Sequence, residues 1–199
     1  MTPTILYLHG FRSSPQSAKA RLFGAAVAAL PAAVRPRLYV PDLVPEPARA
    51  VAALADWIDA ERRVRPDAPL TIVGSSLGGF YATALAERFG ARAVLINPAI
   101  RPYADLADYV GVQENLYTGE RFVVTHEHFA ELRALRVDRI SRPERYFLLV
   151  RSGDELLDWR EAVGHYAGGF QYVAGGGDHS WTEFGTEIGS VLRFAGVMA

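Results

Sequence analysis

The sequence contains no cysteine among its 199 residues. This absence excludes disulfide bonds, a thiol nucleophile and metal sites built on thiolates, and it fits a reducing compartment. The sequence also lacks an excess of either charge, because 21 Lys and Arg residues stand against 22 Asp and Glu residues. A formal net charge of −1 gives no electrostatic basis for binding nucleic acid or an anionic membrane surface.

Long apolar runs are absent as well. No uninterrupted run approaches the roughly 20 residues of a membrane-spanning helix. No basic stretch followed by an apolar run precedes residues 4–8, so we expect no signal peptide. These absences predict a soluble, cytoplasmic protein, and the sequence carries no signal for a particular oligomeric state. Half of the residues are hydrophobic, which suffices for the large core of a single domain over residues 1–199.

Short apolar runs alternate along the chain with longer segments of helical periodicity. The expected strands are 4–8, 37–43, 70–74, 92–97, 144–152 and 170–175, and the expected helices are 16–30, 47–63, 76–89, 159–167 and 182–195. This alternation predicts an α/β fold, with a mostly parallel sheet flanked by helices on both faces. The strand runs are almost continuously apolar, as expected when both faces of a sheet are covered.

Residues 99–142 interrupt the alternation. This segment is more polar, carries scattered aromatic residues and has no strand-like run. We therefore expect a small helical cap, inserted between two strand units of one α/β domain.

One short motif lies where a ligand site is expected. Ligands bind beyond the carboxyl ends of parallel strands, and Ser76 follows the 70–74 strand within Gly74-Ser75-Ser76-Leu77-Gly78. This matches the G-x-S-x-G pattern, in which a tight strand-to-helix turn exposes a serine hydroxyl near a helix N-terminus. The alternatives are a glycine-rich packing turn or a phosphate loop. A phosphate loop is disfavoured because no Lys-Ser or Lys-Thr pair follows the glycines.

A serine nucleophile needs a general base and an acid that orients the base. Hydrolases with this turn supply them in the chain order Ser, acid, His. His179 follows the 170–175 strand, and Asp154 follows the 144–152 strand directly after a glycine. The sequence therefore predicts Ser76, Asp154 and His179 on one edge of the sheet.

Other histidines and carboxylates compete less well for these roles. Asp158 is expected to cap a helix, and Asp178 to bond within its own loop. His165 lies inside an expected helix. His126 and His128 resemble a metal-binding pair but have no evident third ligand, so we predict no metal site.

The tetrahedral oxyanion of an acyl transfer needs hydrogen-bond donors. The backbone N–H of Leu77 is one candidate, and that of Phe11, after the first strand, is the second. Gly10 allows a substrate to approach the backbone closely. Tyr103 is a candidate for lining an acyl pocket, as are other aromatic and apolar residues of the cap: Tyr109, Leu116, Tyr117, Phe122 and Phe129.

Taken together, these segments resemble the α/β-hydrolase superfamily and, more narrowly, the small YqiA-like esterases. The resemblance is carried by LYLHGFRSSPQSAKA (6–20), GSSLGGFYAT (74–83), LINPAIRPY (95–103), ENLYTGERFVVTHEH (114–128), SRPERYFLLVRSGDELLDWREAVGHYAG (141–168) and GGGDHSW (175–181). It implies a single hydrolase domain without a cofactor, a triad of Ser76, Asp154 and His179, and oxyanion donors at Phe11 and Leu77.

The resemblance also implies esterase activity on acyl esters with short chains, so we expect a serine esterase for small-molecule acyl esters. A thioesterase or acyltransferase with the same triad remains open, because pocket shape selects the leaving group and the acceptor. A binding protein on a hydrolase fold is a further alternative, since fold does not fix function.

Overall fold

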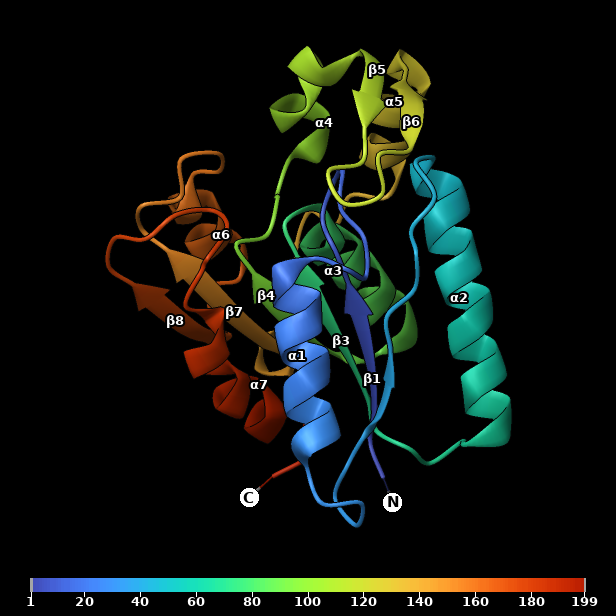
Figure 1. Cartoon of the computed structure of the whole chain (residues 1–199), viewed down its shortest axis with the longest axis vertical. Helices are drawn as coiled ribbons and strands as arrows, with labels where there is room; N and C mark the ends of the chain where they lie inside the picture. The colour runs from blue at the N-terminus through green and yellow to red at the C-terminus, as the bar shows by residue number, and fades with distance from the viewer. Residues whose placement is uncertain (1, 199) are drawn as a thin grey trace.

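The computed structural model describes residues 2–198 and arranges the main strands in one sheet (Figure 1). The sheet order is β2-β1-β3-β4-β7-β8, and every pairing within it is parallel. Its strands are β1 (Thr4–Leu8), β2 (Arg37–Tyr39), β3 (Leu70–Ser75), β4 (Arg92–Ile96), β7 (Tyr146–Arg151) and β8 (Phe170–Ala174). The predicted parallel α/β sheet is therefore confirmed, with β3 and β4 at its centre.

Helices cover both faces of this sheet, which explains the almost continuous apolar strands. Ile5 and Val73 pack on one face with helices α1 and α7, whereas Leu6 and Ile72 pack on the other with α2 and α3. Figure 1 shows α1 and α7 together on the near side of the sheet. The bounds of the flanking helices are α1 (Ala18–Ala29), α2 (Pro47–Val64), α3 (Leu77–Phe89), α6 (Trp159–His165), η3 (Phe184–Glu187) and α7 (Ile188–Phe194).

The inserted segment forms a cap beyond the carboxyl ends of the strands, at the top of Figure 1. It contains α4 (Pro102–Asp105), η1 (Ala107–Tyr109), β5 (Gly111–Glu114), β6 (Arg121–Val124) and α5 (His126–Ala134), and η2 (Pro143–Arg145) leads back to the sheet. β5 and β6 pair antiparallel, so the expectation of a cap without strands was wrong. Each strand has four residues, and Val112 and Val123 are exposed. The hairpin therefore lacks the buried apolar run that reveals a strand in a sequence.

Within residues 2–198, no helix combines the length and the apolar character that crossing a membrane requires.

Candidate active site

Ser76 lies at the junction of β3 and α3, with backbone angles φ 55° and ψ −123°. A positive φ is uncommon for a residue other than glycine and stores strain of the order of 1–3 kcal/mol. The turn is held by backbone hydrogen bonds: the Ser76 N–H donates to Ile96, and the Ser76 carbonyl accepts from Gly79 and Ala99. The serine hydroxyl makes no cap bond to α3. The strained turn thus presents a hydroxyl that the helix does not use.

The two motif glycines are required by close backbone contacts. A Cβ atom on Gly74 would lie 2.2 Å from the carbonyl oxygen of Gly78. A Cβ atom on Gly78 would lie 2.2 Å from the carbonyl oxygen of Leu8 in β1. Both distances are far below van der Waals contact. Glycine is therefore required two residues before and two residues after Ser76, as the G-x-S-x-G pattern of the sequence predicts.

His179 and Asp154 come together although 25 residues separate them. His179 Nδ1 lies 2.8 Å from Asp154 Oδ2, and the Asp154 side chain is only 2% exposed. The other oxygen, Asp154 Oδ1, accepts the backbone N–H groups of Leu156 and Leu157, each at 2.9 Å. Both carboxylate oxygens are therefore engaged, which fixes the acid and, through it, the imidazole ring.

The other two candidate carboxylates, Asp158 and Asp178, have the local roles that the sequence predicts. Asp158 is the N-cap of α6, where its Oδ1 accepts the backbone N–H of Arg160 at 3.0 Å. Asp178 Oδ1 accepts the backbone N–H of Trp181 at 2.8 Å, within its own loop. Both capping and loop-bonding predictions are confirmed. This leaves Asp154 as the carboxylate that contacts the His179 ring. Glu155 Oε2 accepts only the backbone N–H of His179, at 2.9 Å.

Asn97, which the sequence analysis missed, anchors the loop that carries His179. This buried residue follows β4 and has a φ of 41°. Its Nδ2 donates to the carbonyl oxygens of Asp178 and His179 at 3.3 and 3.1 Å, and its Oδ1 accepts the N–H of Arg151 at 2.9 Å. In the sequence, this role is indicated only by a polar residue at the end of an apolar strand run. Asn97 therefore ties three strand-end segments together beneath the candidate base.

Asn97→Ala should destabilise the protein by about 2–4 kcal/mol, because buried partners lose their hydrogen bonds and alanine disfavours the left-handed backbone. We also expect kcat for the predicted ester hydrolysis to fall by about tenfold, because a loosened loop misplaces His179, the predicted base. Urea unfolding and steady-state kinetics measure the two effects. An unchanged unfolding midpoint together with unchanged kcat would contradict the anchoring role.

The predicted oxyanion donors flank Ser76. Leu77 is the first residue of α3, where backbone N–H groups have no partner within the helix. Gly10 approaches closely, since a Cβ atom there would lie 3.1 Å from Ser76 Cβ. Among residues 2–198, the N–H of the neighbouring Phe11 takes part in none of the loop or turn hydrogen bonds. The backbone arrangement can thus offer two N–H groups beside one hydroxyl.

Ser76, His179, Gly10 and Phe11 line one open cavity of about 180 Å³. In the part of the chain that the structure describes, no hydrogen bond joins Ser76 directly to His179. From the cap, Leu116 and Tyr117 reach this cavity. Tyr103 does not: its ring lies 5.3 Å from the Arg133 guanidinium carbon and packs against the core. The prediction that Tyr103 lines the substrate site is therefore not supported by its position, because α4 turns it toward α5.

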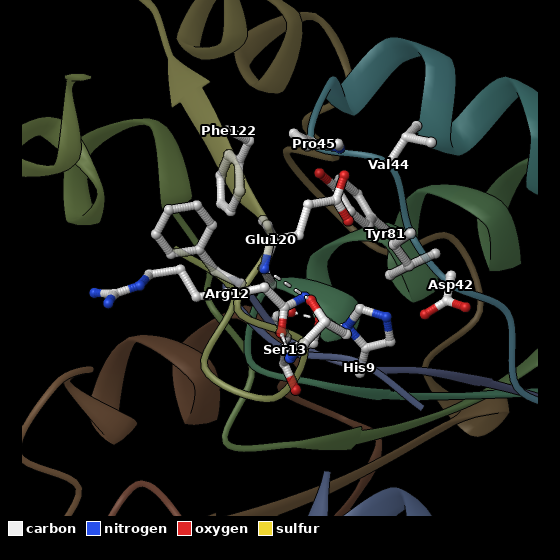
Figure 2. Close-up of a pocket in the computed structure, with 15 residues that line it drawn as sticks. His9, Arg12, Ser13, Asp42, Val44, Pro45, Tyr81, Glu120 and Phe122 are labelled. Carbon is white, nitrogen blue, oxygen red and sulfur yellow. Dashed lines mark hydrogen bonds between the residues drawn. The ribbon is translucent and has the colours of Figure 1, made fainter. Parts of the chain in front are cut away.

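A second cavity lies on the other side of the loop at residues 9–13, between the cap and the sheet (Figure 2). His9, Tyr81 and Glu120 face it, whereas the Arg12 side chain extends away from them. His9 Nδ1 lies 3.0 Å from the Gly10 carbonyl oxygen, so that nitrogen donates. Burial lowers the pKa of His9, against smaller opposing effects of this bond and of Asp42. Phe122 lines this second cavity rather than the one that contains Ser76.

The remaining histidines have local roles. His128 Nδ1 accepts the backbone N–H of Thr125 at 3.0 Å and so caps α5, and the His126 ring contacts Phe129. His165 ends α6, and burial lowers its pKa. Over the described residues, no group of three histidine or carboxylate side chains is arranged to hold a metal ion.

A family model matches residues 4–196, which is nearly the whole chain. The chain belongs to the uncharacterised protein family UPF0227. The expected resemblance to the YqiA-like family is confirmed, and the chain has the fold of the α/β-hydrolases.

Solved structures similar to this UPF0227 member share its fold at low sequence identity. Est1E from Butyrivibrio proteoclasticus matches with a TM-score of 0.73 and 11% identity, over 99% of this chain and 89% of its own. A protein from Agrobacterium vitis S4 assigned as a hydrolase matches with a TM-score of 0.71 and 21% identity, over 98% of this chain and 88% of its own. The esterase domain of a Rhodothermus marinus protein matches with a TM-score of 0.66 and 17% identity, over 97% of this chain and 88% of its own. These neighbours are esterases and hydrolases on an α/β-hydrolase fold.

Proposed function

We propose that this protein is a serine esterase that hydrolyses small acyl esters with short chains, using Ser76, His179 and Asp154. The observation that carries the proposal is the 2.8 Å contact between the buried Asp154 and His179, which lines the same cavity as the strained Ser76. A buried carboxylate that orients an imidazole, with a half-buried serine in the same cavity as that imidazole, is the arrangement that nucleophilic acyl transfer requires. The esterases and hydrolases among the structural neighbours are consistent with it.

In the proposed reaction, Ser76 Oγ attacks the ester carbonyl carbon while His179 Nε2 takes the hydroxyl proton. The N–H groups of Phe11 and Leu77 stabilise the resulting oxyanion, each contributing about 3–4 kcal/mol. The carbon–oxygen bond to the alcohol then breaks, and His179 returns the proton to the leaving alcohol. An acyl group remains on Ser76.

In the second half, His179 removes a proton from water, whose oxygen attacks the acyl carbon. The bond to Ser76 Oγ breaks, the proton returns to that oxygen, and the carboxylic acid leaves. Asp154 holds the ring and stabilises its cation throughout. Every step uses groups of this chain and water, so no metal or organic cofactor takes part.

Release of p-nitrophenol from acetate, butyrate, octanoate and palmitate esters tests this proposal. We expect turnover that declines as the acyl chain lengthens, with a butyryl thioester as a parallel substrate that reports on thioesterase activity. A fluorophosphonate probe should label one peptide, with the adduct on Ser76 by mass spectrometry. Absence of turnover together with labelling of any other residue would refute the assignment.

A further inference from the structure

Lys19 is the only lysine of the chain, since the other 20 basic residues are arginines. It lies in the first turn of α1, is half-buried, and lines the cavity that contains Ser76 and His179. Its Nζ donates to the carbonyl oxygen of His179 at 3.2 Å, although 160 residues separate the two. The single lysine ammonium of this protein is therefore in the candidate active site.

The positive charge of Lys19 is not matched by a contacting carboxylate. Among residues 2–198, none of the ion pairs within 4.0 Å includes Lys19. Burial lowers the pKa of Lys19 to about 8, although Asp154 and Asp178 act from a longer distance in the opposite direction. A partly desolvated ammonium with donors to spare favours an anionic partner.

A second donor in the same cavity, the Tyr7 hydroxyl, has no hydrogen-bond partner among the described residues. The Tyr7 side chain is only 1% exposed, and among the described residues its hydroxyl makes no hydrogen bond. Tyr7 lines the cavity that holds Lys19 and Ser76. Burial raises the pKa of Tyr7, so the phenol keeps its proton and can donate it. A buried hydroxyl without an acceptor costs free energy of folding, and a hydrogen bond to an anionic oxygen of a ligand would offset that cost.

We propose that Lys19 and Tyr7 form a subsite for a carboxylate carried by the ester substrate, so that the preferred substrates are hemiesters of short dicarboxylic acids. The inference rests on the proposed esterase function and names its substrate class. One ammonium and one phenol match the single charge of a carboxylate. The other nearby cation, Arg12, donates its Nε–H to the Glu114 carbonyl oxygen of the cap.

A carboxylate can be carried by either half of an ester, and the assay separates the two cases. Ethyl hydrogen glutarate has the charge on the acyl half, 3-butyryloxypropanoate has it on the alcohol half, and ethyl pentanoate is the neutral reference. Acid release by pH-stat gives kcat/KM for each. We expect the first compound to exceed the neutral ester by at least about tenfold, the effect of a hydrogen bond to a charged group. A preference for 3-butyryloxypropanoate would mean that the recognised charge lies on the alcohol half, and would refute the hemiester class.

Lys19→Met should remove this preference, measured as the ratio of kcat/KM for the glutarate hemiester to that for ethyl pentanoate. Tyr7→Phe should reduce the same ratio by a few fold. The matched control is Arg21→Met, which removes an exposed positive charge from the same helix and should leave the ratio unchanged. Equal losses on both esters in Lys19→Met would mean that Lys19 only positions His179, and would overturn the subsite.

A binding measurement separates this inference from the proposed reaction. Because the chain has one lysine, 13C-lysine labelling gives a single Cε resonance, and its titration reports the pKa of Lys19. In Ser76→Ala protein, ethyl hydrogen glutarate should shift this resonance and raise that pKa, whereas ethyl pentanoate should do neither. Such a response would support the subsite even if no ester were turned over. Failure of succinate, glutarate and adipate hemiesters to shift the resonance would overturn it, whether or not Ser76 is the nucleophile.

Discussion

Replacing Ser76 by alanine is expected to lower kcat for p-nitrophenyl butyrate by at least about 10⁴-fold, because the acyl-enzyme no longer forms. The free energy of unfolding should change by less than about 0.5 kcal/mol, the usual range for a side chain without a structural role. The hydroxyl makes no cap bond to α3, and the positive φ of this position should cost alanine about as much as serine, because both carry a Cβ atom. We therefore expect this variant to lose its activity and to keep its stability.

The neighbouring serine provides the matched control. Ser75 ends strand β3, is buried, and lines the same cavity, but its backbone is that of an ordinary strand residue. We expect Ser75→Ala to keep kcat within about tenfold of the wild type, since it leaves the nucleophile in position. Steady-state kinetics on freshly purified protein and thermal unfolding measure both variants. Substantial turnover by Ser76→Ala, or its loss only in Ser75→Ala, would assign the chemistry to another group.

Much of the candidate site was predictable because parallel strands all end at one edge of the sheet. Ser76, Asp154 and His179 each follow a strand, so their sequence positions alone indicated a common edge. The requirement for glycine at Gly74 and Gly78 was also predictable, since a tight turn leaves no room for side chains. In both cases the information is local: a strand run, a turn residue and the order of elements along the chain.

Other features depend on contacts between distant segments. The bond of Lys19 to the His179 carbonyl joins the first helix to the last loop, and no local pattern encodes it. The position of Tyr103 depends on the direction in which α4 leaves the sheet. The β5–β6 hairpin escaped notice because each strand has only four residues and because two of its exposed residues, Val112 and Val123, are apolar. The sequence therefore shows no alternation of apolar and polar residues there.

Asp154→Asn is expected to lower kcat by about 10⁴-fold with little change in fold, through the tautomer of His179. Asp154 Oδ1 accepts two backbone N–H groups, so the carbonyl oxygen of the new amide must take that place. The amide NH₂ then faces His179 Nδ1 and donates to it. This forces the ring proton onto Nε2, the atom that must accept the proton of Ser76, and the base is blocked.

Asp158→Asn is the control for this change, because it makes the same chemical replacement four residues away. Asparagine is as good an N-cap as aspartate, so α6 should keep its stability and kcat its wild-type value. The 15N shifts of the His179 ring distinguish the tautomers directly: Nδ1 should carry the proton in the wild type and Nε2 in Asp154→Asn. A variant that retained more than about a tenth of wild-type kcat, or that kept the proton on Nδ1, would show that Asp154 does not orient the base.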